Sequence, residues 1–173
     1  MTESPALVIR PARPGDTAPI HRLIGALADY EKLRHEMEAS VDDLDRALFG
    51  EQPYARALIA ERQGEPVGYA LYFYTFSTFT GRPSLYLEDL FVMPSHRSQG
   101  TGRALLARLA DIALQDGCGR FEWSVLDWNA PSIRFYESLG AHRHDEWQLY
   151  RLTGDELARL ASESSRERDH GGE

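Results

Sequence analysis

The chain has 173 residues, which suits one domain of about 150 residues with a sizeable hydrophobic core. Its 19 Lys and Arg and 27 Asp and Glu residues give a net charge of −8, which disfavours non-specific binding to nucleic acid or to anionic membranes. The single cysteine, Cys118, excludes an internal disulfide and a paired-cysteine metal or redox site. There is neither an apolar run of about 18 residues nor a signal-peptide pattern, so we expect a cytoplasmic protein outside the membrane.

The first third of the chain predicts one strand and two helices. An apolar run over residues 7–10 is typical of a strand, and prolines follow it. Asp16 is a suitable N-cap for a helix over about 17–33, in which apolar residues recur at helical spacing. Ser40 would cap a second helix over residues 42–49. The apolar stripe gives the first helix one face to bury.

The middle of the chain is rich in predicted strands. Strands over residues 57–60 and 67–76 flank a turn at residues 63–65, as in a hairpin. A third strand over 85–93 has few polar interruptions, which favours an interior position in the sheet. Three neighbouring strands joined by short turns must be antiparallel, so a purely parallel doubly wound sheet does not fit.

The last part of the chain alternates between helices and strands. Four elements are expected: a helix over 100–115, a strand over 121–126, a helix over 130–138 and a strand over 147–152. Residues 162–173 are polar and charged, so we expect a disordered tail after a single domain over residues 1–161.

A basic, glycine-containing turn joins the third middle strand to the helix that follows it. Gly100 and Gly102 have no Cβ, so an anion can approach the backbone at a helix N-terminus, where unpaired N–H groups gather. Arg97 and Arg103 add positive charge. The turn therefore predicts a pyrophosphate site, although glycines that serve packing alone would give the same pattern. The turn is not a Walker loop, because the Gly-Lys-Ser/Thr motif is missing. It is not a dinucleotide fingerprint either, because Leu105 stands where that motif needs a small residue.

Four separated segments extend this pattern to a family. The Arg-x-x-Gly-x-Gly turn stands with residues 27–33, 86–93, 125–129 and 131–141 in the order seen in GNAT-superfamily acyltransferases. Over residues 7–160 the chain resembles the diamine (spermidine/spermine) and thialysine N-acetyltransferase branch of that superfamily. The resemblance implies an α/β (α+β) GNAT fold, with a mixed, mostly antiparallel sheet of six or seven strands flanked by four helices. It also implies a homodimer, and a central strand splayed from its neighbour to admit the acetyl–pantetheine arm.

The resemblance further implies that acetyl-CoA is the co-substrate and that no metal takes part. The expected coenzyme-binding residues are Leu90, Phe91 and Val92 on the strand, Arg97, Ser98, Gln99, Gly100, Thr101, Gly102 and Arg103 in the turn, and Asn129 and Ser132 on the opposite wall.

Acetyl transfer to an amine requires that the ammonium lose a proton and that the departing thiolate gain one. By the resemblance, Tyr136 is the general acid. Glu88 takes the substrate side, either as a base through a water molecule or as a binding group only. Asp89 follows Glu88 on a strand, where neighbours face opposite ways, and would reach the site from a dimer partner. Outside this context Tyr136 would suggest core packing and Glu88 a strand-end salt bridge.

The amine is expected to be a primary amine of a small molecule, either a diamine or polyamine or a thialysine-like amino acid. Tyr30 and Glu31 match the amine site of the family, and Asp145 stands near the position of a distal acidic residue. Arg34 follows where polyamine enzymes tend to carry further acids, and it would bind the carboxylate of an amino-acid substrate.

Two other functions remain open at this point. One is a non-catalytic acyl-CoA-binding regulator, and the other is a protein-lysine or N-terminal acetyltransferase. His142 and His144 alternate on a strand but lack a third strong metal ligand, so we interpret them as surface residues.

Overall fold

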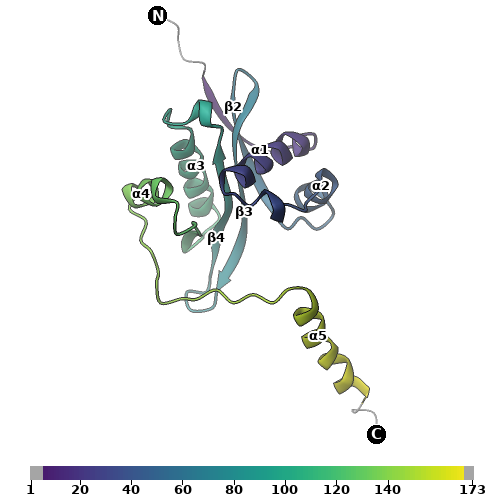
Figure 1. Cartoon of the computed structure of the whole chain (residues 1–173). Coiled ribbons are helices and arrows are strands. Elements are labelled where there is room, and N and C mark those ends of the chain that lie inside the picture. Colours follow the sequence, from purple (N-terminus) through teal and green to yellow (C-terminus); the bar gives the residue numbers. More distant parts are fainter. Residues whose placement is uncertain (1–5, 170–173) are drawn as a thin grey trace, which may run out of the picture. The chain divides into compact units, whose positions relative to one another are not determined.

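The computed structural model describes residues 6–169, with side chains as far as Ser164. The described chain forms two compact units, one that ends at Ser124 and one that begins at Val125 (Figure 1). The first unit contains the sheet and three helices, and the second contains two helices.

One five-stranded sheet forms the frame of the first unit. Its strands follow chain order across the sheet: β1 (Leu7–Pro11), β2 (Arg56–Arg62), β3 (Glu65–Ser77), β4 (Arg82–Val92) and β5 (Arg120–Trp123). Neighbours from β1 to β4 are antiparallel, whereas β5 runs parallel to β4. The expected mixed, mostly antiparallel sheet is thus confirmed, although it has five strands in the described chain where six or seven were expected.

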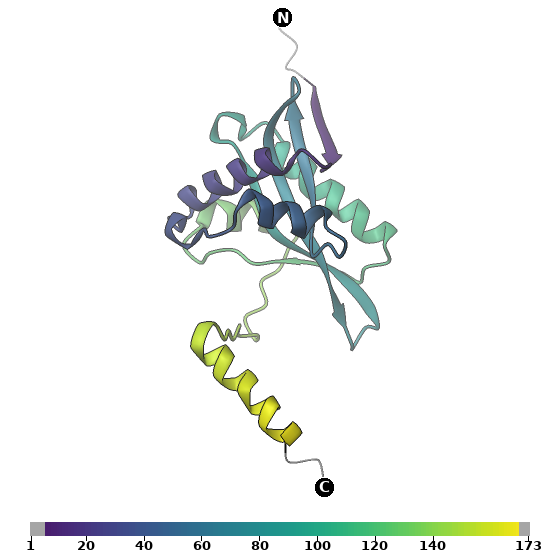
Figure 2. The ribbon, with the colours of Figure 1, turned by 90° about the vertical axis from the view of Figure 1, so that its right-hand side faces the viewer.

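Helices cover both faces of this sheet. In Figure 1 the sheet is seen nearly edge-on, with α1 (Thr17–Tyr30) and α2 (Val41–Phe49) on one side and α3 (Thr101–Gln115) on the other. Figure 2 shows α1 and α2 crossing the strands on their shared face. The buried core under these two helices consists of Ile20, Leu23, Leu48, Ala57, Ile59, Tyr69, Leu71 and Phe91.

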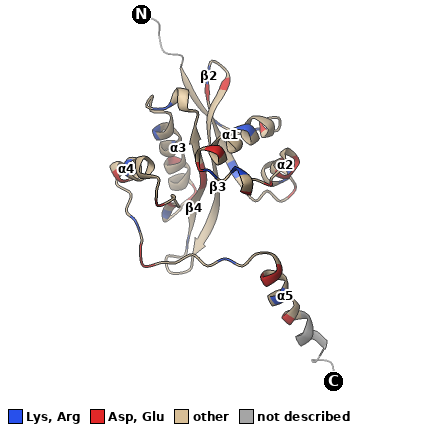
Figure 3. Cartoon of the chain, in the orientation of Figure 1, with Lys and Arg blue, Asp and Glu red and all other residues tan. Residues whose placement is uncertain are grey.

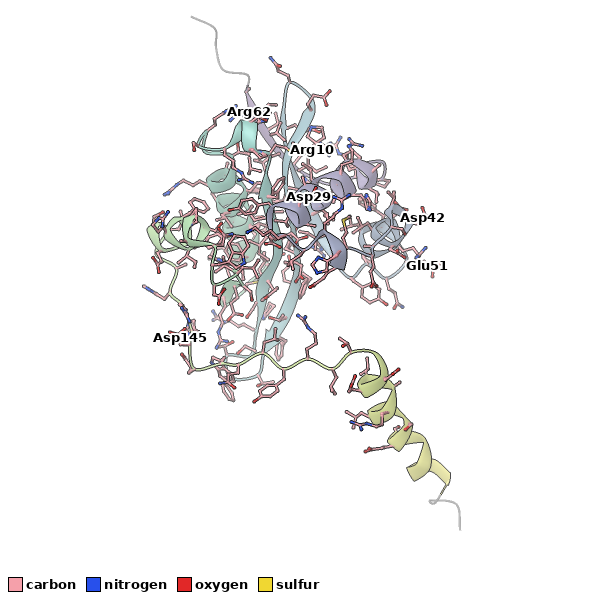
Figure 4. All side chains as sticks on the ribbon, viewed as in Figure 1. Arg10, Asp29, Asp42, Glu51, Arg62 and Asp145 are labelled. Carbon is pink, nitrogen blue, oxygen red and sulfur yellow. The ribbon has the colours of Figure 1, made fainter. Side chains whose placement is uncertain are left out.

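Side-chain caps and ion pairs fix the N-terminal helices. Ser40 and Asp43 form a reciprocal capping box at the start of α2, as the serine predicts. Asp16 precedes α1 but does not cap it with a side-chain hydrogen bond. Its carboxylate binds Arg10 at 2.7 Å, and Arg10 also binds Glu61 at 2.6 Å (Arg10 is labelled in Figure 4). This half-buried network ties α1 to the first two strands.

A β-bulge interrupts β4 at Glu88. Leu71 of β3 pairs with Asp89, whereas the next residue, Tyr72, pairs with Leu87, so Glu88 is an extra residue in the ladder. Tyr69 and Leu71 belong to the core under α1, and residues of β3 alternate between faces. Asp89 therefore lies on the α1 face, while Leu87 lies on the α3 face.

The second unit consists of α4 (Ala130–Ser138), α5 (Gly154–Asp169) and the segments around them. The expected strand over 147–152 is wrong, because in the described chain this segment pairs with no other strand. The part of the chain that the structure describes also has five α-helices rather than four, since α5 includes most of the segment expected to be a disordered tail. A polar, charged sequence is as compatible with a solvated helix as with disorder. Residues 170–173 of the expected tail lie outside the described residues. None of the described helices is long and apolar enough to cross a membrane.

Candidate active site

The turn between β4 and α3 has the shape of an anion site. Gly100 precedes the helix with a φ of 78°, in the left-handed region that favours glycine, and Ser98 has a φ of 59°. Gly100 offers no side chain to cap the helix, so the first N–H groups of α3 remain available to another acceptor. A Cβ built on Gly100 would meet no atom within 4 Å, so there is room beside the backbone. These features fit a pyrophosphate.

Two arginines support this turn. The Nε of Arg97 donates to the Val92 carbonyl at 2.9 Å, and its guanidinium lies 4.7 Å from the Tyr30 ring centroid and 5.4 Å from that of Phe91. Arg97 therefore fastens the turn to the C-terminal end of α1 by cation–π contacts. Arg62 of β2, labelled in Figure 4, reaches the Gln99 carbonyl at 3.4 Å.

The sheet provides an open edge next to the turn. β5 pairs with β4 only through residues 84–87, whereas β4 continues to Val92. Leu90, Phe91 and Val92 thus lie beyond the parallel ladder, as expected for a strand that leaves its neighbour. Phe91 is buried in the core, and Leu90 and Val92 are half-buried.

One carboxylate contacts a buried tyrosine on the α1 face, and the charges of two others act on that tyrosine. The hydroxyl of Tyr69 donates to Oδ2 of Asp89 at 2.9 Å. Burial raises the pKa of Asp89 to about 6; the Tyr69 hydrogen bond opposes this rise, and the negative charges of Glu88 and Glu31 add to it. Burial, and after it the charges of Asp89, Glu31 and Glu88, raise the pKa of Tyr69 well above its usual value. Burial also raises the pKa of Glu31, which follows α1 directly. The acidic residues of this end of α1 and of β4 are red in Figure 3.

The structure thus brings together the amine-site residues expected in the first unit. Glu31, Glu88 and Asp89 interact with one phenol, and Tyr30 lies beside them in sequence, under Arg97. The expectation that Glu88 and Asp89 face opposite ways assumed an unbroken strand. The bulge leaves Glu88 exposed and outside the ladder, so the prediction about its facing stays a prediction; its charge and that of Asp89 both raise the pKa of Tyr69, and Asp89 contacts the phenol.

Other expected residues lie in the second unit or already have partners. Asn129 caps α4 by accepting a hydrogen bond from the Ser132 N–H at 3.3 Å, and Tyr136 lies within the same helix. Asp145 is exposed and pairs with Arg143. Arg34 pairs with Asp29 at 3.3 Å, and both side chains are exposed.

Sequence reasoning missed Tyr69 and Arg62. Tyr69 sits in an apolar strand with nothing nearby in sequence to suggest a polar partner, and its contact with Asp89 depends on the register of two strands. Arg62 lies 37 residues before Gln99, so only the folded sheet brings it to the turn. Among the described residues, no group of three His, Cys, Asp or Glu side chains has a metal-binding arrangement.

Comparisons with known proteins agree with this geometry. The sequence model of the acetyltransferase (GNAT) family matches residues 22–141. Thialysine N-epsilon-acetyltransferase of Sus scrofa is 40% identical over 167 residues, which cover 90% of this chain and 98% of that protein. L-ornithine N5-acetyltransferase of Arabidopsis thaliana is 30% identical and covers 86% of this chain and 85% of its own length. Among solved structures, an integron cassette protein of V. cholerae has a TM-score of 0.76 and 28% identity, with 90% of this chain and 97% of that chain covered. The chain therefore belongs to the acetyltransferase (GNAT) family and is an acyltransferase.

Proposed function

We propose that this chain transfers the acetyl group of acetyl-CoA to a primary amine of a small, cationic molecule. One observation carries the proposal: β4 ends in a glycine turn whose geometry suits an anion, and the same strand supplies Asp89, which contacts Tyr69, and Glu88 beside it. An anionic coenzyme and a cationic amine would thus be held next to each other, as a direct transfer requires.

The coenzyme fits the residues of the first unit. Backbone N–H groups from Ser98 to Arg103 would hold the pyrophosphate, and the space beside Gly100 would let it approach. Arg97 serves this cradle by fixing the turn, while the exposed Arg103 supplies charge at the start of α3. When bound, acetyl-CoA would supply an acetyl group already activated as a thioester.

Backbone groups of Leu90, Phe91 and Val92 would line the acetyl and pantetheine portions. N–H groups on this free edge would stabilise negative charge that develops on the acetyl oxygen. By the family resemblance we assign Tyr136 as the general acid, and Asn129 and Ser132 as coenzyme-binding residues.

The carboxylates would select the amine. Glu31, Glu88 and Asp89 repel one another in a partly desolvated site, and a bound ammonium would relieve that repulsion. One carboxylate must then accept the proton that the amine loses, and the resemblance leaves Glu88 either as that base, through a water molecule, or as a group that only binds the amine.

The names of the two relatives reported above favour a basic amino acid over a long polyamine, although a 38% identical relative is named for spermidine and spermine. Thialysine and ornithine, which the relatives' names mention, both carry a terminal amine and an α-amino acid head. A substrate carboxylate would compete with Asp29 for the exposed Arg34. We further propose a homodimer, on the family resemblance alone, in which Asp145 serves as the distal acid.

The test is a substrate panel with the purified protein and acetyl-CoA. Putrescine, spermidine, spermine, lysine, ornithine and thialysine are each assayed for release of the CoA thiol. We expect the highest kcat/KM with thialysine or ornithine. Acetyl-CoA binding by calorimetry without thiol release from any amine would instead support the acyl-CoA-binding regulator. Faster acetylation of peptides than of free amines would favour the protein acetyltransferase.

A charge-deletion pair tests the amine site. Glu31→Gln is expected to raise the KM of the best amine about tenfold, because a charge-assisted contact of about 1.4 kcal/mol is lost. Glu51→Gln makes the same change at an exposed position after α2 and should leave KM unchanged. Equal KM values for the two variants would remove Glu31 from the site.

A further inference from the structure

Tyr69 is a buried polar side chain that the proposed chemistry does not yet use. It lies on β3 with no exposed surface, inside the apolar core under α1. A phenol in such a place requires a hydrogen-bond partner, and its hydroxyl donates to Oδ2 of Asp89 at 2.9 Å. A packing role alone would be met by phenylalanine.

Strand pairing makes this contact specific. Leu71 pairs with Asp89 and Tyr69 pairs with Phe91, so Tyr69 and Asp89 are diagonal neighbours on one face. The bulge at Glu88 brings Asp89 to that face. The phenol donates to one carboxylate oxygen, and a carboxylate offers about four lone-pair sites, so acceptor capacity remains for a substrate N–H group.

The surroundings of Asp89 suit proton transfer near neutral pH. The titratable groups that act on it are Tyr69 from β3, Glu88 from β4 and Glu31 from the end of α1. Burial raises its pKa to about 6, so Asp89 is mostly ionised at pH 7 and still readily protonated. The Tyr69 hydrogen bond lowers the pKa and thus keeps the carboxylate ionised against burial and two like charges.

We propose that Tyr69 is a positioning residue that holds Asp89 as the acceptor of the proton lost by the substrate amine, an inference that rests on the acetyltransferase function proposed above. In this step the N–H bond of the ammonium breaks, its electron pair stays on nitrogen, and an O–H bond forms on Asp89. The neutral nitrogen is then able to attack, and Asp89 returns its proton to solvent after the product leaves. Glu88 and Glu31 bind the amine and do not receive its proton.

The experiment compares pH profiles of kcat/KM for the best amine of the panel. Tyr69→Phe keeps the ring but removes the hydrogen bond that stabilises ionised Asp89, so the acidic limb should move up by about one pH unit. Asp89→Asn should abolish this limb and most of the activity. Tyr74→Phe is the matched control, because its hydroxyl donates to Asp116 at the end of α3, on the opposite face of the sheet. The acidic limb of the Tyr74→Phe profile should stay at the wild-type pH.

A ¹³C NMR titration of the Asp89 carboxyl without substrate separates this inference from the proposed function. The carboxyl pKa should rise in Tyr69→Phe and stay unchanged in Tyr74→Phe, with melting temperatures recorded for both. If no variant or wild-type protein acetylates an amine, the proposed function fails, and with it the role of Asp89 as acceptor, whatever the titration shows. If the wild type is active, two results overturn the inference. One is an acidic limb of the kcat/KM profile that stays in place in Tyr69→Phe. The other is an acidic limb that is lost in Glu88→Gln but kept in Asp89→Asn.

Discussion

Gly68→Ala should destabilise the sheet at the point where the proposed coenzyme site begins. Gly68 of β3 pairs with Val92 at the end of β4. A Cβ at this position would lie 2.8 Å from the Phe91 carbonyl oxygen and 3.3 Å from Cγ2 of Val92, whereas ordinary contacts begin at 3.4 Å. The carbonyl belongs to the backbone, so β4 itself must move. Such overpacking costs about 1–3 kcal/mol, and the lower chain entropy of alanine in the unfolded state returns about 0.4–1 kcal/mol.

The expected net loss is about 1–2 kcal/mol, which lowers the melting temperature by about 5 °C in a chain of this size. Differential scanning calorimetry measures this loss. The KM for acetyl-CoA should rise as well, because Phe91 and Val92 are the residues displaced. Gly119→Ala is the control, since its Cβ would meet its nearest neighbour at an ordinary 3.5 Å. Equal stability of the Gly68→Ala and Gly119→Ala proteins would show that β4 accommodates the added methyl group without strain.

Three further substitutions test separate features. Tyr136→Phe should lower the acetylation rate about 100-fold in a thiol-release assay and leave acetyl-CoA binding nearly intact; a fully active variant would exclude the general-acid role. Asp16→Asn should cost about 1–2 kcal/mol at pH 7, because the Arg10 guanidinium holds the pKa of Asp16 below its usual value. This contribution is present above about pH 4 and is lost as pH falls through the lowered pKa, so urea denaturation should show the two proteins converging in acid. Gly100→Ala should lower the free energy of unfolding by about 1 kcal/mol, because its φ of 78° is strained for alanine. The same change should weaken CoA binding in calorimetry, and an unchanged affinity would place the anion elsewhere.

Local chemistry made much of the fold predictable. Ser40 signals the start of α2 through its own capping box, and Asn129 and Gly140 bracket a helix whose bounds match the prediction. Gln63 and Gly64 have φ values of 53° and 80°, as expected of a two-residue hairpin turn. The glycine turn before α3 was predictable for the same reason, since glycine spacing and a helix start lie within a few residues.

Features that depend on distant pairing were not predictable. The bulge at Glu88 exists only relative to β3, and Tyr69 meets Asp89 only through that register. The segment over residues 147–152 shows the opposite failure. Its alternation predicts a strand, but a strand needs a partner backbone, and the described chain provides none for it.

Because of the bulge in β4, the alternation of side chains between the two faces of the sheet shifts by one residue within the strand. Leu87 and Asp89 are both odd-numbered, yet they serve opposite faces because one inserted residue separates their pleats. Deleting Glu88 would restore a regular pleat and would turn either Leu87 away from the α3 face or Asp89 toward it. The number of residues in this strand therefore matters to the proposed amine site as much as their identity does. Single-residue length changes here should be tolerated far less than exchanges of side chain.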